Sequence, residues 1–180
     1  MTDTSLSVAQ QDLARAYAGG APGVVVSGLV WVIAGAVWQL YGTMAAFAAL
    51  FIGGMAIHPL GTLIERIAFR GPKATIGKPL EALAIEATVP LFTGVLIAWV
   101  LLVRAPDLAI PVFAAIIGAR YFLFRTMYGD IAYWALGGAI LLIATLALFG
   151  IDLPVNIGFL VGAIELVAAA MILRRWRNPT

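Results

Sequence analysis

Long apolar stretches alternate with short polar breaks along most of the chain. Each stretch has close to the roughly 20 residues that an α-helix needs to cross a bilayer. Six stretches fit this length: 22–41, 43–64, 87–103, 108–127, 131–149 and 153–173. The pattern predicts one all-α integral membrane domain, residues 1–180, built as a bundle of six transmembrane helices.

The breaks between these stretches are short, with one exception. Only Tyr41 and Gly42 separate the first two stretches, so these two are expected to form a tight helical hairpin. Residues 65–86 form a longer basic loop in which a helix is expected to start at Pro79.

The segment ahead of the first apolar stretch, within residues 1–21, has a different pattern. Apolar residues recur at Leu6, Ala9, Leu13 and Tyr17, which is the spacing of one helical face. Two interpretations stay open: a cytoplasmic helix lying on the inner membrane surface, or a frayed polar tail.

The composition supports a membrane location and excludes several kinds of site. The chain is 63% hydrophobic and 11% charged, with a mean hydropathy of +1.03, whereas soluble domains carry roughly 25% charged residues. The absence of cysteine excludes disulfides, thiolate metal sites and cysteine nucleophiles. The net charge of +2 is too small to indicate a nucleic-acid partner, and no cofactor is expected.

The basic residues predict the orientation. If the N-terminus is cytoplasmic, the basic residues outside the predicted helices lie on the cytoplasmic side, with the exception of Arg104. This group includes Arg15, the basic residues of the 65–86 loop, and Arg174, Arg175 and Arg177. The positive-inside rule then places both termini and the 65–86 loop in the cytoplasm.

A weak internal symmetry links the two halves of the chain. Pro90-x-x-x-Gly94 opens the third predicted helix, and Pro154-x-x-x-Gly158 opens the sixth. Two inverted three-helix halves, common in transporters, would explain this spacing. Proline is also frequent at helix starts and glycine in membrane helices, so chance similarity is the alternative.

Charged residues inside predicted membrane helices are costly and therefore mark candidate sites. Arg120 and Glu165 each lie about 12 residues, or roughly 18 Å, from the same side of the membrane. Their matched depth predicts an ion pair between the fourth and sixth helices. Glu165 also shares a face with Gly158 and Gly162, which would let another helix approach closely. Such a pair could serve helix packing or a substrate or proton site.

His58 is followed directly by Pro59, which cannot donate a backbone hydrogen bond and is expected to bend the helix. Because Gly61 lies on the same side, His58 is expected to be buried in the inner half of the membrane. A titrating imidazole there would suit proton-coupled work, and a hydrogen bond to a neighbouring helix is the alternative. His58 is the only histidine, so it cannot form a metal site.

Glu86 and Pro90 lie four residues apart at the inner mouth of the third helix. Pro90 leaves the Glu86 carbonyl without its helical donor, so polar groups would gather there. With His58, Arg120 and Glu165, Glu86 forms a hypothetical pathway for a substrate or ion. Glu86 ending in the headgroup layer is the alternative.

Two short runs resemble a known family. They are the outer turn Arg104-Ala105-Pro106-Asp107-Leu108 and the stretch from Leu160 to Leu166. In these runs the chain resembles the HdeD-like six-helix bacterial membrane proteins. The resemblance implies six helices, the bacterial inner membrane and a role in acid stress. It covers the second half only, and the first half, including residues 56–61, looks more like an uncharacterised bacterial membrane family.

These features favour two functions. The first is a small transporter or channel for a proton-coupled or small polar solute; the second is a non-catalytic structural or stress-response protein. No enzyme is expected, because no phosphate-binding glycine loop, zinc-protease motif or serine beside a base occurs. Membrane lipids are the expected partners, and a homo-oligomer stays open. A water-filled cavity reaching His58 and Glu165 would favour transport, and a dry bundle the structural role.

Overall fold

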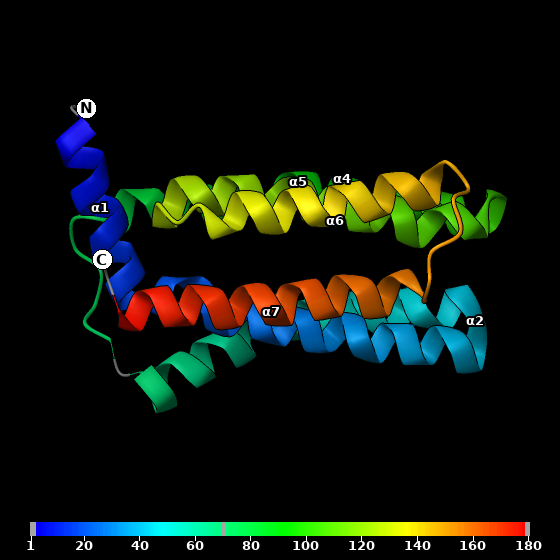
Figure 1. Cartoon of the computed structure of the whole chain (residues 1–180), viewed down its shortest axis with the longest axis horizontal. Coiled ribbons are helices and arrows are strands. Elements are labelled where there is room, and N and C mark those ends of the chain that lie inside the picture. The colour runs from blue at the N-terminus through cyan, green and yellow to red at the C-terminus, as the bar shows by residue number, and fades with distance from the viewer. Residues whose placement is uncertain (1–2, 70, 179–180) are drawn as a thin grey trace.

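The computed structural model describes residues 3–69 and 71–178, and every regular element in these ranges is helical. The α-helices in Figure 1 are α1 (Asp3–Ala16), α2 (Ala21–Ile64), α3 (Glu81–Glu86), α4 (Thr88–Arg104), α5 (Pro106–Tyr128), α6 (Ala132–Leu148) and α7 (Ile157–Arg177). The structure also contains three short helical turns: 3₁₀ turns at Ala18–Gly20 and Lys78–Leu80, and a π-helical turn at Glu65–Phe69. The predicted all-α class is confirmed, and the helix start expected at Pro79 falls inside the 3₁₀ turn that leads into α3.

The helix α2 folds back on itself at Gly42 (Figure 1). Gly42 has φ 82°, a left-handed conformation that glycine adopts without steric cost. A side-chain carbon added to Gly53 would lie 2.5 Å from Val30, and one added to Gly61 would lie 3.3 Å from Gly23. The arm before Gly42 and the arm after it therefore run antiparallel, and the predicted hairpin is confirmed.

The helices form two layers (Figure 1). One layer holds α4, α5 and α6, with α5 in contact with both neighbours, and the other holds α7 and the two arms of α2. Contacts of α6 with α7 and of α2 with α5 join the layers. The ring of Phe113 on α5 lies 6.0 Å from Trp31 and 5.8 Å from Phe47, between centroids. Large aromatic rings bury much apolar area, so this cluster stabilises the contact between the layers.

Four helical stretches are long and apolar enough to cross a membrane: Ala18–Phe69, Lys78–Arg104, Pro106–Tyr128 and Ile157–Arg177. The first contains the α2 hairpin, and each arm of about 21 residues is about 30 Å long. The apolar helix α6 has 17 residues and is shorter, at about 25 Å. Helices of this kind indicate a membrane protein, and the number of crossings stays a prediction.

Both ends of the chain lie at the same end of the bundle (Figure 1), as six crossings would require. The turn between the two arms of α2 and the connection between α6 and α7 lie at the opposite end. We refer to these as the terminal end and the far end. The cytoplasmic location of the terminal end stays a prediction.

The last helix begins at Ile157 rather than at 153, which corrects the predicted boundary. Asn156 sets this start, because its Oδ1 accepts a hydrogen bond from the Gly158 amide at 2.7 Å. This bond satisfies an amide that no helical carbonyl can reach. Asn156 Nδ2 also donates to the carbonyl oxygen of Gly35 at 3.3 Å, which fixes the start of α7 against α2.

The two sequence halves do not form separate layers. The last helix of the first half, α4, packs on α5, and the last helix of the second half, α7, packs on α2. Two inverted halves could each place their last helix against the other half in this way. The contacts do not show an inverted repeat, however, so the repeat stays a prediction.

The helix α1 lies across the terminal end of the bundle (Figure 1). Its predicted apolar face is confirmed, because Ala9 and Leu13 are 3% and 0% exposed. This face packs against protein: a side-chain carbon on Gly77 would lie 2.5 Å from the Ala9 carbonyl oxygen. Gln10 Nε2 also donates to the Thr126 carbonyl of α5 at 2.8 Å. The bundle end therefore covers the face that a membrane-surface helix would insert into lipid.

Asp12 of α1 binds the loop that follows α2. Its Oδ2 accepts hydrogen bonds from the backbone amides of Thr75 at 2.7 Å and Gly77 at 2.9 Å. These bonds, led by that from Gly77, hold the pKa of Asp12 below its ordinary value of 3.8. The contact is therefore complete above that value and is lost as the pH falls through the lowered pKa.

Replacing Asp12 with asparagine should loosen this loop, because a neutral amide oxygen accepts weaker hydrogen bonds than a carboxylate. Hydrogen exchange at Thr75 and Gly77 should lose protection in Asp12→Asn at neutral pH. The exposed neighbour Gln11 provides the control, since Gln11→Ala should leave both amides protected. Equal protection in Asp12→Asn and wild type would show that other contacts hold the loop.

Candidate functional site

Glu165 is a charged side chain that the described part of the chain buries completely, with 0% exposed. Its Oε1 accepts a hydrogen bond from the Tyr121 hydroxyl at 2.6 Å, and its Oε2 has no hydrogen-bond partner among the described residues. Ser27 of α2 lies next to both residues and is 7% exposed. A half-satisfied carboxyl group inside an apolar bundle is costly, which makes Glu165 the strongest candidate for function.

Close contacts between α7 and the first arm of α2 position Glu165. A side-chain carbon on Gly162 would lie 2.7 Å from the Gly28 carbonyl oxygen, and one on Gly158 would lie 2.8 Å from the Gly35 Cα. These gaps admit no side chain, so the two backbones touch, as small residues in membrane helices allow. The predicted small-residue face of α7 is confirmed, and α2 is its partner.

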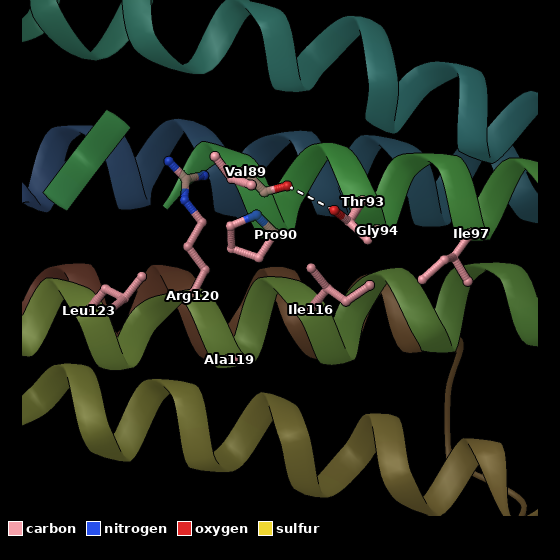
Figure 2. A pocket seen from close by; sticks show the side chains of 9 residues that line it. All are labelled: Val89, Pro90, Thr93, Gly94, Ile97, Ile116, Ala119, Arg120 and Leu123. Carbon is pink, nitrogen blue, oxygen red and sulfur yellow. Dashed lines mark hydrogen bonds between the residues drawn. The ribbon is translucent and has the colours of Figure 1, made fainter. Parts of the chain in front are cut away.

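The predicted ion pair between Arg120 and Glu165 is wrong. Arg120 extends from α5 towards α4 and lies beside Val89 in Figure 2, with its guanidinium carbon 5.1 Å from the Phe124 ring centroid. Consecutive residues of an α-helix point about 100° apart, so Tyr121 faces α7 and Arg120 cannot. The matched depth of Arg120 and Glu165 is compatible with a pair, but their directions are not.

A different ion pair occurs at the terminal end. Arg175 Nη1 lies 2.8 Å from Asp130 Oδ1, and the Arg175 side chain is 56% exposed. Exposed pairs of this kind contribute little to stability, typically below about 1 kcal/mol.

His58 is exposed, so its predicted burial is also wrong. The second arm of α2 buries Leu50 and Gly61, and the half-buried Ile57 lies on the same side of the helix. His58 follows Ile57 and points about 100° away from that side. Pro59 is exposed too, and α2 continues beyond it to Ile64; the predicted bend at this proline stays a prediction.

Glu86 lies at the junction of α3 and α4 and is exposed. Pro90 stands in the first turn of α4, where it lines a groove that Arg120 also lines (Figure 2). Of the four predicted pathway residues, Arg120 and Glu165 are near enough to interact electrostatically. Glu86 and His58 are both exposed.

A column of stacked tyrosines leads from Glu165 towards the terminal end. The rings of Tyr121 and Tyr133 have centroids 6.2 Å apart, those of Tyr133 and Tyr128 have centroids 5.7 Å apart, and both pairs are tilted by 23°. The Tyr133 hydroxyl donates to the Gly19 carbonyl at 2.6 Å. We call Tyr121, Tyr133 and Tyr128 the tyrosine column.

Acidic residues gather at the base of this column. The Tyr17 hydroxyl donates to Glu81 Oε1 at 2.7 Å, and burial together with this bond raises the pKa of Tyr17 to about 12. The charges of Glu65 and Glu81 act on both Tyr17 and Tyr128. Ionisable groups from distant parts of the sequence therefore meet where the column reaches the terminal end.

One feature of the sequence indicated the tyrosine column but did not enter the predictions. Tyr128 and Tyr133 fit the usual interface belt of membrane helices, which explains tyrosines near helix ends without any site. However, Tyr121 and Tyr128 are seven residues apart and so share one face of α5. A short turn then reverses the chain and brings Tyr133 back against that face.

Glu165 and His58 stand outside the walls of the two cavities described next. A groove of about 430 Å³ between α4 and α5 includes Arg120 in its wall (Figure 2). A cavity of about 350 Å³ at the far end includes Asp107 and Asp152. In the described ranges, no three residues of the metal-binding types stand close enough together to hold a metal ion.

Apolar helices of spanning length, packed around a buried carboxyl group, define the class as a multi-helix membrane protein. Residues 6–175 match a family model described as a family of unknown function, DUF7010. The chain belongs to that family. No curated protein and no solved structure matches it. The resemblance to HdeD-like proteins gains no support here, whereas an uncharacterised family agrees with the alternative prediction.

Proposed function

We propose that the protein is a small proton transporter or channel in which Glu165 gains and loses the proton. The supporting observation is the carboxyl group of Glu165, which is completely buried, with one oxygen bonded to Tyr121 and the other without a hydrogen-bond partner in the described part of the chain. A change in its protonation would change the charge inside the apolar bundle by one unit. That change would alter the contacts of α7 with α5 and α2, because a membrane interior tolerates charge poorly.

The surroundings of Glu165 support proton exchange with the terminal end. Tyr121 and Arg120 of α5 and Ser27 of α2 are the groups that act on it. The tyrosine column supplies hydroxyl groups, which can both donate and accept, between Glu165 and the acidic residues at its base. In the proposed orientation this end is cytoplasmic, and the protein lies in the bacterial inner membrane without enzymatic activity.

Proton uptake into liposomes tests this proposal. A pH-sensitive dye trapped with wild-type protein should report uptake when a potassium diffusion potential is imposed. Glu165→Gln should lower the rate roughly a hundredfold, the effect of removing a positioned proton-transfer group. Glu86→Gln makes the same chemical change at an exposed site and should leave the rate unchanged.

Uptake no faster than through empty liposomes, or equal uptake by wild type and Glu165→Gln, would refute the proposal. Both proteins must keep their folded state during the assay. A thermal denaturation midpoint measured in the same preparation therefore accompanies each rate.

A structural role is the second candidate, favoured by the close packing around Glu165. Neither cavity reaches it, and glycine contacts close the interface between α7 and α2. In this case the bond from Tyr121 to Glu165 serves to dock α7 on α5. Proteoliposomes would show no proton uptake, while Glu165→Gln would still lower the denaturation midpoint.

A further inference from the structure

The groove between α4 and α5 is apolar and is open at the side of the bundle. Its walls include Val89 and Ile97 of α4 and Ile116 and Leu123 of α5 (Figure 2). Val89 and Ile97 are 66% and 45% exposed. Within the layer, α4 contacts α5 on one side and leaves its other side uncovered. In a membrane, the groove would therefore open directly to lipid.

Arg120 places a charge without an ion-pair partner among the described residues in this groove. Its Nε is buried and has no hydrogen-bond partner among the described residues, and no carboxylate of these residues lies within ion-pair distance of its guanidinium. The hydroxyl of Thr93 does not serve it either, because that group donates to the Val89 carbonyl at 3.2 Å (Figure 2). A cation in apolar surroundings is costly, so an anionic partner from outside the chain would stabilise it.

The depth of the guanidinium fits a lipid headgroup. Arg120 lies about 12 Å from the end of α5 at Tyr128, which is at the terminal end. Its side chain reaches Val89 in the first turn of α4 (Figure 2). A long arginine side chain can extend towards the headgroup layer in this way while its aliphatic part stays in hydrocarbon.

We propose that this groove binds one anionic phospholipid. The phosphate lies against Arg120, and one acyl chain lies along the groove towards Ile97. The charge of Arg120 complements the phosphate, and the apolar walls complement the chain. Arg120 also acts electrostatically on Glu165, but lipid retention and proton uptake are measured separately, so failure of this site and failure of the proposed transport function can be distinguished.

Native mass spectrometry of the detergent-solubilised protein tests the site. After incubation with equal amounts of phosphatidylglycerol and phosphatidylcholine, wild type should retain phosphatidylglycerol with about fivefold preference, the effect of one basic residue near a membrane surface. Arg120→Gln should bring the preference close to one.

Arg125→Gln is the matched control. Arg125 is on the same helix, stacks on Trp134 at 5.6 Å and has a buried Nε without a partner among the described residues, but it does not line the groove. This variant should keep the preference. Equal preference in wild type and Arg120→Gln, or an equal loss in Arg125→Gln, would overturn the proposal.

A second variant tests the groove itself. Ala119 is an exposed residue of the groove, so Ala119→Phe should fill the space, keep the fold and displace the bound lipid while Arg120 stays in place. Glycerol phosphate added in excess should not compete, because it lacks the acyl chain. Displacement by glycerol phosphate would identify a soluble phosphate as the occupant. A lipid-free dimer that Ala119→Phe dissociates would identify a second copy of the chain, and either result would refute the lipid site.

Discussion

Replacing Gly162 with leucine is expected to separate α7 from α2 and to cause the largest loss of stability among the single changes considered. A side-chain carbon at Gly162 would lie 2.7 Å from the Gly28 carbonyl oxygen and 2.6 Å from Val32 Cγ2. The obstacle at Gly28 is backbone, which cannot rotate away as a side chain does. Overpacking typically costs about 1–3 kcal/mol, and an obstacle of this kind places Gly162→Leu at or above the upper limit.

The thermal denaturation midpoint in detergent measures this effect, with Gly138→Leu as the control. A side-chain carbon on Gly138 of α6 meets nothing within 4 Å, so the same substitution has room there. It should be neutral or slightly stabilising, because leucine favours the helical state over glycine by up to about 1 kcal/mol. Similar midpoints for the two variants would mean that the contact between α7 and α2 does not limit stability.

Removing the Tyr121 hydroxyl is expected to have the second largest effect. Tyr121→Phe keeps the ring but removes the hydrogen bond to Glu165, whose other oxygen already has no partner among the described residues. A buried polar group left without a partner costs about 1–3 kcal/mol. The denaturation midpoint of Tyr121→Phe should therefore fall well below that of wild type.

The double variant Tyr121→Phe with Glu165→Leu should recover part of this loss, because it removes the carboxyl group that the single change leaves unsatisfied. Tyr41→Phe provides the control, since Tyr41 is 74% exposed and its hydroxyl can reach solvent or lipid headgroups. Additive losses in the double variant would show that the two side chains are not energetically coupled.

The helices could be predicted from the sequence, but the directions of their side chains could not. Apolar runs and the break at Gly42 predicted the helical segments, because spanning length and backbone freedom are properties of the local sequence. Arg120 and Tyr121 differ by one position, and either could have faced α7. A helix that is apolar all round lacks the polar face that reveals the orientation of a soluble helix.

The same reasoning explains the errors at His58 and the missed tyrosine column. Only packing decides whether Ile57 or His58 faces the bundle. The bond from Tyr17 to Glu81 joins residues 64 positions apart, and nothing in either local sequence indicates the other. The small-residue face of α7 was predictable, because close approach requires glycine whichever helix is the partner.

The α2 hairpin has a consequence for how the chain enters the membrane. Its two arms are joined at Gly42 without a polar loop, and a side-chain carbon on Gly42 would meet nothing within 4 Å. A nascent chain can therefore insert both arms together as a preformed pair, with no hydrophilic segment to translocate between them. Each arm satisfies its own backbone hydrogen bonds on the way in. A substitution that stiffens Gly42 should thus delay biogenesis before it weakens the finished bundle.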